Sequence, residues 1–133
     1  MHAEEHPPAD ALPTALNHVH LITDDPDAEI RFLCGALGFK RDPSHPGFVW
    51  LGNMQLAVSK GEPIRHPRFH LGFRMDSVAH VAAFRDRLRR WGVETTEPSQ
   101  DGSYYSLYFT DPAGYRFEVY AEGGIPALGT LPD

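Results

Sequence analysis

The sequence predicts an α+β fold made of two consecutive βαβββ modules with mixed sheets. The first observation is a pattern that occurs twice along the 133-residue chain: a strand-like segment, an amphipathic helix-like segment and three short strand-like segments. The second observation is spacing, because His18 to His70 and Gly38 to Gly92 are separated by nearly equal numbers of residues. One supersecondary unit is therefore used twice.

The first module begins with a strand expected over residues 16–22. Asp24 and Asp25 then supply an N-cap, Pro26 suits the first helical turn, and Gly38 ends the helix. Apolar residues follow the i, i+3, i+4, i+7 spacing of one helix face: Ile30, Leu33, Cys34 and Leu37. Short strands are expected at residues 39–41, 48–51 and 54–58, the last two joined at Gly52-Asn53.

The second module repeats this order. A strand is expected over residues 69–75, Asp76 or Ser77 caps the next helix, and Gly92 ends it. The apolar face of that helix consists of Val81, Phe84, Leu88 and Trp91. Strands are then expected at residues 93–95, 104–109 and 115–121, the last two joined by the turn Asp111-Pro112-Ala113-Gly114.

The chain length fits one domain with one core. We expect this domain over residues 15–122, with module one at 15–60 and module two at 67–122. The flanking segments 1–14 and 123–133 contain many Pro and Gly residues and are expected to be flexible tails.

The composition excludes several classes of partner. A net charge of −6 offers no basic stripe, so neither nucleic acid nor an anionic membrane is an expected partner. Cys34 is the only cysteine, which rules out an intrachain disulfide and fits a reducing compartment. The amino terminus lacks the apolar stretch of a signal peptide, and no long apolar run occurs. The expected location is the cytoplasm.

Strand alternation separates an apolar sheet face from a polar one, since successive side chains point to opposite faces. The apolar set, which the helices should cover, is Val19, Leu21, Phe69, Leu71, Phe73, Leu107, Phe109, Phe117 and Val119. The polar set is His18, His20, His70, Gly72, Arg74, Tyr104, Ser106, Tyr108, Arg116, Glu118 and Tyr120. A sheet with such a polar face is expected to curve around a ligand.

Within the polar set, His18, His70 and Glu118 are candidate metal ligands. Two imidazoles and one carboxylate can hold a divalent transition metal on one side and leave positions open for substrate. Fe, Mn, Zn, Ni and Co all suit these ligands, and affinity alone does not choose among them. His20 and Tyr108 are the candidate catalytic residues, for proton transfer and for donation to a substrate oxyanion respectively, with a packing role as the alternative.

Four further residues are candidate substrate contacts. Arg74 and Arg116 could bind a substrate carboxylate through paired hydrogen bonds, or could instead pair with an acid on a neighbouring strand. Ser106 and Tyr104 belong to the same polar face and present hydroxyl groups.

These residues resemble the vicinal oxygen chelate superfamily, which includes glyoxalase I, extradiol dioxygenases, fosfomycin-resistance enzymes and bleomycin-resistance proteins. The resemblance covers residues 16–121 and rests on LNHVHLITDDPDAEIRFLCGALGF, RFHLGFRM and SLYFTDPAGYRFEVY. It implies a curved mixed-sheet cup around a metal, with ligands on the first strand of each module and on the last strand of the second. His18, His70 and Glu118 occupy those places. It also implies a small-molecule substrate and a homodimer.

Departures from the family pattern bear on the reaction. The resemblance implies that glyoxalase I holds its metal with four protein ligands. The position of the fourth ligand falls near Gln55 or Ala57 in this chain, where there is no carboxylate. Fosfomycin-modifying relatives carry cations before the penultimate strand, whereas residues 94–103 hold three acids and no Lys or Arg. Ring-cleaving dioxygenases place an acid/base histidine where Gln55 occurs, although Tyr108 matches their tyrosine. Oxygen insertion, isomerisation and group addition all stay open.

The leading hypothesis is a metal-dependent, glyoxalase- or dioxygenase-like enzyme that acts on a small oxygen-rich metabolite or xenobiotic. The alternative is a metal-free protein that binds or sequesters a small molecule, as the bleomycin-resistance branch does. The complete set of His18, His70 and Glu118 favours the enzyme.

Overall fold

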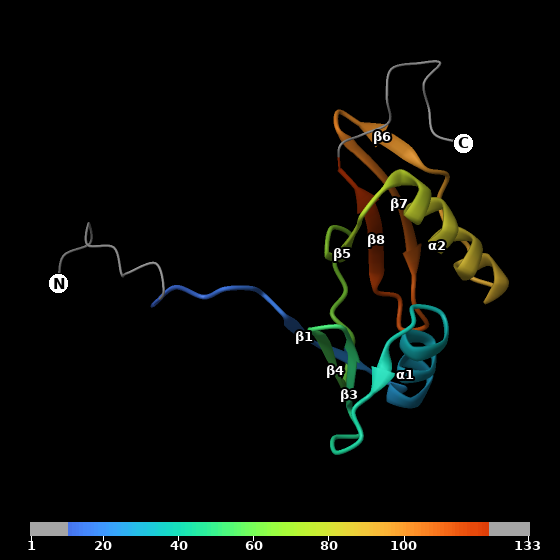
Figure 1. Ribbon diagram of the computed structural model, residues 1–133. Coiled ribbons are helices and arrows are strands. Elements are labelled where there is room, and N and C mark those ends of the chain that lie inside the picture. The colour runs from blue at the N-terminus through green and yellow to red at the C-terminus, as the bar shows by residue number, and fades with distance from the viewer. Residues whose placement is uncertain (1–10, 123–133) are drawn as a thin grey trace.

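The computed structural model describes residues 11–122 and shows two four-stranded mixed sheets with two helices (Figure 1). The predicted α+β fold of two βαβββ modules is confirmed, and each sheet is open. The expected tails fall largely on residues 1–10 and 123–133, which lie outside the described residues. No helix within residues 11–122 is long and apolar enough to cross a membrane.

The first sheet contains the four strands of module one, in the order β1-β4-β3-β2. The edge strand β1 (His18–Thr23) runs parallel to β4 (Met54–Lys60), with His18 opposite Gln55 and His20 opposite Ala57. β3 (Phe48–Leu51) and the two-residue β2 (Lys40–Arg41) complete the sheet in antiparallel pairs. Helix α1 (Pro26–Gly35) connects β1 to β2.

The second sheet has the equivalent order β5-β8-β7-β6. The edge strand β5 (His70–Met75) runs parallel to β8 (Arg116–Ala121), which also pairs antiparallel with β7 (Tyr104–Thr110). Helix α2 (Val78–Arg90) follows β5, and β6 (Ser99–Asp101) lies at the far edge. This register places Glu118 directly between Gly72 of β5 and Tyr108 of β7.

The helix boundaries follow the signals read from the sequence. The Asp25 carboxylate accepts a hydrogen bond from the Ala28 N–H at the start of α1, and the Ser77 hydroxyl accepts one from the His80 N–H at the start of α2. Gly38 and Gly92 have φ values of 88° and 74°, in the left-handed region that glycine adopts most easily after a helix.

The strand expected at residues 93–95 is wrong as placed. In that segment only Thr95 makes an isolated bridge, to Phe109, and the edge strand of the second sheet is β6 at Ser99–Asp101. β6 pairs with β7 through a tight turn in which Gly102 has a φ of 62°. The reason is the Gly102-Ser103 turn between the paired residues Asp101 and Tyr104, because glycine at the first turn position suits a two-residue hairpin loop and determines where the strands pair.

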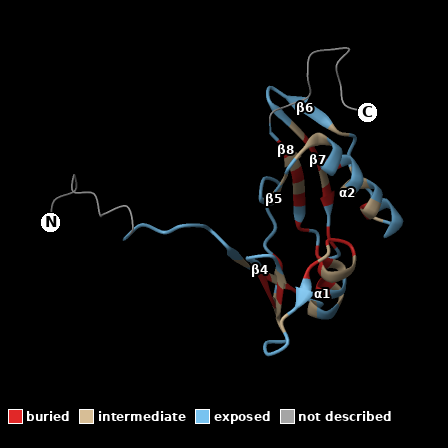
Figure 2. Cartoon of the chain, in the orientation of Figure 1, coloured by how far each residue is buried: buried red, intermediate tan, exposed pale blue. Residues whose placement is uncertain are grey.

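One hydrophobic core unites the two modules, because apolar residues of both pack in it (Figure 2). The Phe32 ring of α1 lies 6.3 Å from the Phe109 ring of β7. The Arg87 guanidinium of α2 donates to the carbonyls of Ala36 and Gly35, at 2.9 and 2.8 Å. These contacts give the last turn of α1 hydrogen-bond partners from the other module.

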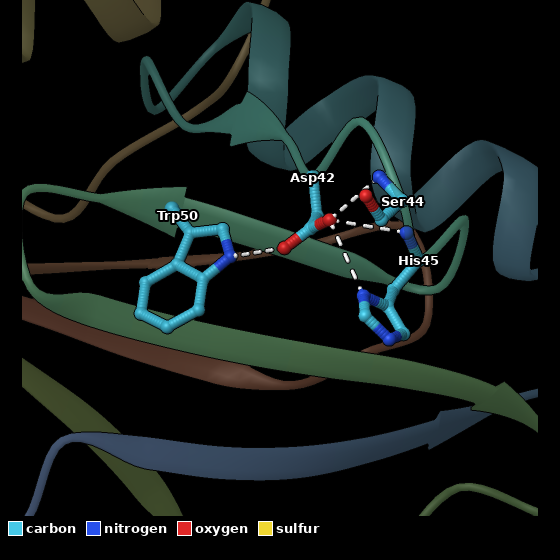
Figure 3. A network of polar contacts seen from close by, with 4 residues as sticks. All are labelled: Asp42, Ser44, His45 and Trp50. Atoms are coloured by element: carbon cyan, nitrogen blue, oxygen red, sulfur yellow. Dashed lines mark hydrogen bonds and ion pairs between the residues drawn. The ribbon is translucent and has the colours of Figure 1, made fainter.

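A polar network braces the turn between β2 and β3 (Figure 3). The Asp42 carboxylate accepts hydrogen bonds from the backbone N–H groups of Ser44 and His45, and from the Trp50 indole at 2.8 Å. The Ser44 hydrogen bond first, and the Trp50 hydrogen bond next, lower the pKa of Asp42. The network lies at a loop and fits a structural role.

Candidate functional site

The polar face of the second sheet forms a hollow of about 420 Å³. Strand alternation predicts this face correctly, since every β7 and β8 residue in its wall belongs to the polar set. Strand β6 adds Ser99 and Asp101 to this wall, two residues outside the expected polar set, because the turn at Gly102-Ser103 pairs β6 with β7. The lining residues are Ser99, Asp101, Tyr104, Ser106, Tyr108, Glu118 and Tyr120.

His70 and Glu118 form a pair at the edge of this face. His70 Nε2 lies 3.6 Å from Glu118 Oε1, and the two side chains are 39% and 20% exposed. His70 Nδ1 lies 3.0 Å from the Arg68 carbonyl oxygen, which can only accept a hydrogen bond. Nδ1 therefore carries a proton, and Nε2 is the ring nitrogen that faces Glu118 and could bind a metal in the neutral ring.

This donor pair fits a divalent transition metal. Metal-binding histidines commonly donate the second ring N–H to a backbone carbonyl, which fixes the tautomer and the ring orientation. Two ligands that each lie about 2.1 Å from a tetrahedral zinc are about 3.4 Å apart, close to the separation of His70 Nε2 and Glu118 Oε1. The pair could supply two of the three expected ligands.

Tyr108 lies against both members of the pair. Its ring makes an edge contact with the His70 ring, at 5.8 Å between centroids, and the Arg116 guanidinium carbon lies over the Tyr108 ring, 4.1 Å from its centre. Burial, followed by the charge and hydrogen bond of Glu118, raises the pKa of Tyr108. The phenol therefore stays protonated at neutral pH and can donate a hydrogen bond.

His18 and His20 lie on β1 of the other module. His18 Nδ1 is 3.1 Å from Asn17 Oδ1, and His20 Nε2 is 2.7 Å from the Ser59 hydroxyl. Within residues 11–122 no three His, Cys, Asp or Glu side chains gather at metal-binding spacing. A single chain thus brings His70 and Glu118 together and leaves His18 outside that pair.

The remaining candidate substrate residues differ in their surroundings. Arg74 forms an ion pair with Glu122, 2.8 Å between Nη2 and Oε2, which matches the alternative of pairing with an acid. Tyr104 is exposed and packs on the Tyr120 ring at 5.8 Å, whereas Ser106 is buried in the wall of the polar hollow. Burial raises the pKa of Cys34, so its thiol is not an activated nucleophile.

A second hollow, of about 310 Å³, lies between the edge strands β1 and β5. His18 and His70 line it together with mainly apolar side chains, among them Leu16, Met54 and Phe69. Leu16 is 90% exposed, so this region of the described chain presents a large apolar surface.

The family comparison decides the classification. Residues 15–119 match the model of the Glyoxalase/Bleomycin resistance protein/Dioxygenase superfamily. The chain belongs to this superfamily. A comparison with curated proteins gives no match.

Solved structures of superfamily members share this fold. Lactoylglutathione lyase from Agrobacterium tumefaciens has a TM-score of 0.69 at 22% identity, over 82% of this chain and 94% of that one. The fosfomycin resistance protein FosX from Listeria monocytogenes has a TM-score of 0.71 at 22% identity, over 83% and 94%. A glyoxalase/bleomycin resistance protein/dioxygenase from Nocardioides has a TM-score of 0.67 at 21% identity, over 90% and 91%. At these identities the likeness concerns the fold.

Proposed function

We propose that the protein is a cytoplasmic metal-dependent enzyme of the glyoxalase/dioxygenase type that acts on a small oxygen-rich molecule. The observation that carries the proposal is the His70–Glu118 pair, in which imidazole Nε2 faces a carboxylate oxygen at 3.6 Å while Nδ1 donates to a backbone carbonyl. The similarity to lactoylglutathione lyase supports an enzyme, because that name describes a lyase that acts on a small molecule. The single cysteine suits a reducing compartment.

The proposed ligand set is His70 and Glu118 of one chain and His18 of a second copy. β1 and β5 are edge strands with unpaired backbone groups, and the apolar hollow between them is available to a partner. A homodimer that covers this region would bring a second β1 to the polar face. The arrangement explains why one chain alone presents two of the three candidate ligands.

A bound Fe, Mn, Zn, Ni or Co ion would polarise substrate oxygens and stabilise negative charge that develops on them. The protein groups would orient the substrate and move protons. Tyr108, whose pKa is raised, would donate a hydrogen bond to an oxyanion. His20 would arrive with His18 on the same face of the partner β1 and act as an acid or base.

Mixing two inactive variants tests the shared site. His18→Ala and Glu118→Gln homodimers should each lose tight metal binding. After subunit exchange, each mixed dimer contains one intact site and one doubly altered site. Metal content should then recover to about a quarter of the wild-type value in an equimolar mixture, as two-fold symmetry requires. If the mixture binds no more metal than the two separate variants, the ligands do not come from two chains. If His18→Ala retains the metal, His18 is not a metal ligand.

The apolar hollow favours one alternative function, metal-free binding of a small molecule. Its walls are largely apolar with a few polar groups, as in many ligand pockets. Under this alternative, a hydrophobic fluorescent probe should bind wild type and Glu118→Gln equally well, and added metal should not change its affinity.

A further inference from the structure

A third hollow, of about 400 Å³, lies at the end of the second sheet where β5 and β8 begin and β7 ends. The linker between the modules supplies one wall, with Arg65 and His66. The sheet supplies the other, with Thr110 and Arg116. No acidic residue among positions 11–122 lines it, and the whole chain has 12 Lys and Arg against 18 Asp and Glu. The positive charge in this hollow therefore comes from a local cluster of cationic side chains, because the protein as a whole is acidic.

The cations in this hollow have no acidic partner within the described chain. Neither Arg65 nor Arg116 takes part in any of the ion pairs formed among residues 11–122. Asp24 and Glu62 lie beside Arg65 in an adjoining hollow, without forming an ion pair with it. The Arg65 guanidinium also approaches Gly114 closely, since a Cβ at that glycine would lie 3.3 Å from Arg65 Nη1. The two guanidinium groups are therefore free to bind an anion.

The peptide groups of Arg68 set opposite tautomers on the two flanking histidines. The Arg68 N–H donates to His66 Nδ1 at 3.1 Å, which leaves the proton of neutral His66 on Nε2. The Arg68 carbonyl accepts from His70 Nδ1, which places the lone pair of a neutral His70 ring on Nε2. His66 is thus prepared to donate a hydrogen bond without a change of charge, whereas His70 is prepared to bind a metal.

The hollow is next to the proposed metal pair. Arg116 stands opposite His70 in the β5–β8 register, and its guanidinium lies over the Tyr108 ring. A molecule that reaches the His70–Glu118 pair could therefore extend past Arg116 to Arg65.

We propose that Arg65, His66 and Arg116 form a binding site for an oxyanion group, a carboxylate or phosphate, carried by the molecule that the polar face binds. The proposal rests on the proposed function in placing that molecule at the His70–Glu118 pair. Arginine suits such a group because its planar N–H donors match two oxygens at once. The linker thereby supplies the cations that residues 94–103 lack.

Isothermal titration calorimetry of metal-free protein with inorganic phosphate, at low ionic strength, measures the phosphate affinity of this site. Low salt matters because these side chains are exposed and their charges are screened. Arg65→Ala should weaken phosphate binding about tenfold, and Arg65→Ala with Arg116→Ala should weaken it further, as expected for lost charge-assisted hydrogen bonds. Arg90→Ala on α2 removes the same charge elsewhere and should leave the affinity unchanged. Acetate titrated in parallel distinguishes a carboxylate from a phosphate preference.

The proposal is overturned if wild type binds neither anion, if the double variant binds as wild type does, or if Arg90→Ala loses as much affinity as Arg65→Ala. Metal content of the same proteins is measured separately. Phosphate binding that depends on Arg65 in a protein without metal affinity would keep the anion site and refute the metalloenzyme. Normal metal content with no anion binding would do the reverse.

Discussion

Replacing Glu29 by glutamine should remove the contribution of this residue to the pH dependence of stability between mildly acidic and alkaline solution. Glu29 of α1 is 0% exposed and faces Asp111, in the turn between β7 and β8. Both Glu29 carboxylate oxygens and Asp111 Oδ2 are buried from solvent. Asp111 Oδ1 already accepts from the N–H groups of Ala113 and Tyr115. Burial, followed by the hydrogen bond and charge of Asp111, raises the pKa of Glu29 from 4.5 to about 9.

The sign of the effect follows from this pKa. A group whose pKa is higher in the folded state binds its proton more tightly there, so its contribution to stability is complete below the unfolded pKa. That contribution is lost as pH rises from 4.5 towards about 9. One pH unit within this window costs about 1.4 kcal/mol, so raising the pH from about 5 to about 8 should cost roughly 4 kcal/mol. Glutamine is neutral throughout and can donate its amide N–H to Asp111.

Urea denaturation at several pH values measures the effect. The free energy of unfolding of Glu29→Gln, relative to wild type, should rise by roughly 4 kcal/mol between about pH 5 and pH 8. Comparison at each pH cancels the titration of unrelated groups. Glu97→Gln is the matched control, because Glu97 is an exposed residue that pairs with Arg85 at 3.7 Å. Parallel pH curves for wild type and Glu29→Gln would refute the reasoning.

Three further predictions concern the catalytic candidates and the contact between modules. Tyr108→Phe should keep the metal content of wild type and lower turnover on the eventual substrate about 10²-fold, as loss of one oxyanion donor does; unchanged turnover would exclude that role. His20→Ala should also keep the metal while lowering turnover about 10²- to 10⁴-fold, whereas His18→Ala should lose the metal; the opposite pattern would exchange their roles. Arg87→Ala should cost about 1–3 kcal/mol of unfolding free energy, because two carbonyls at the end of α1 lose their donors. Arg90→Ala, on the same helix, should change it little, and equal losses would contradict this assignment.

Local patterns in the sequence determine most of the fold. Helix caps at Asp25 and Ser77 and glycines after each helix are signals within a few residues, and the structure uses them as predicted. Alternation along β7 and β8 likewise places Tyr108 and Glu118 on one face. These features depend on backbone geometry alone, so a single sequence contains enough information.

Features that depend on distant packing were not predictable in the same way. Trp91 fits the apolar face of α2 by spacing, yet it is the C-cap residue and is 57% exposed, with only part of its ring against Gly35 of the other module. Glu29 occurs among charged residues at the start of a helix, and nothing nearby indicates that it is buried against Asp111. The tautomers of His66 and His70 likewise depend on how the linker folds around Arg68.

In the candidate site, too, one part is predictable from local patterns and another depends on distant packing. Strand periodicity predicts that His70 and Glu118 lie on one sheet face, whereas their 3.6 Å approach also requires the β5–β8 register, which periodicity does not give. The position of His18 depends on how modules meet, within one chain or between two, and periodicity has no information on that. Its assignment as a ligand stays a prediction.

The metal content of protein purified without chelators tests the central claim most directly. We predict about one divalent transition metal per chain in wild type and none in Glu118→Gln, because a neutral amide is a much poorer ligand than a carboxylate. Glu97→Gln should retain the wild-type content. Equal and weak binding of Zn(II) or Mn(II) by wild type and Glu118→Gln would contradict the assignment of this site as a metal centre.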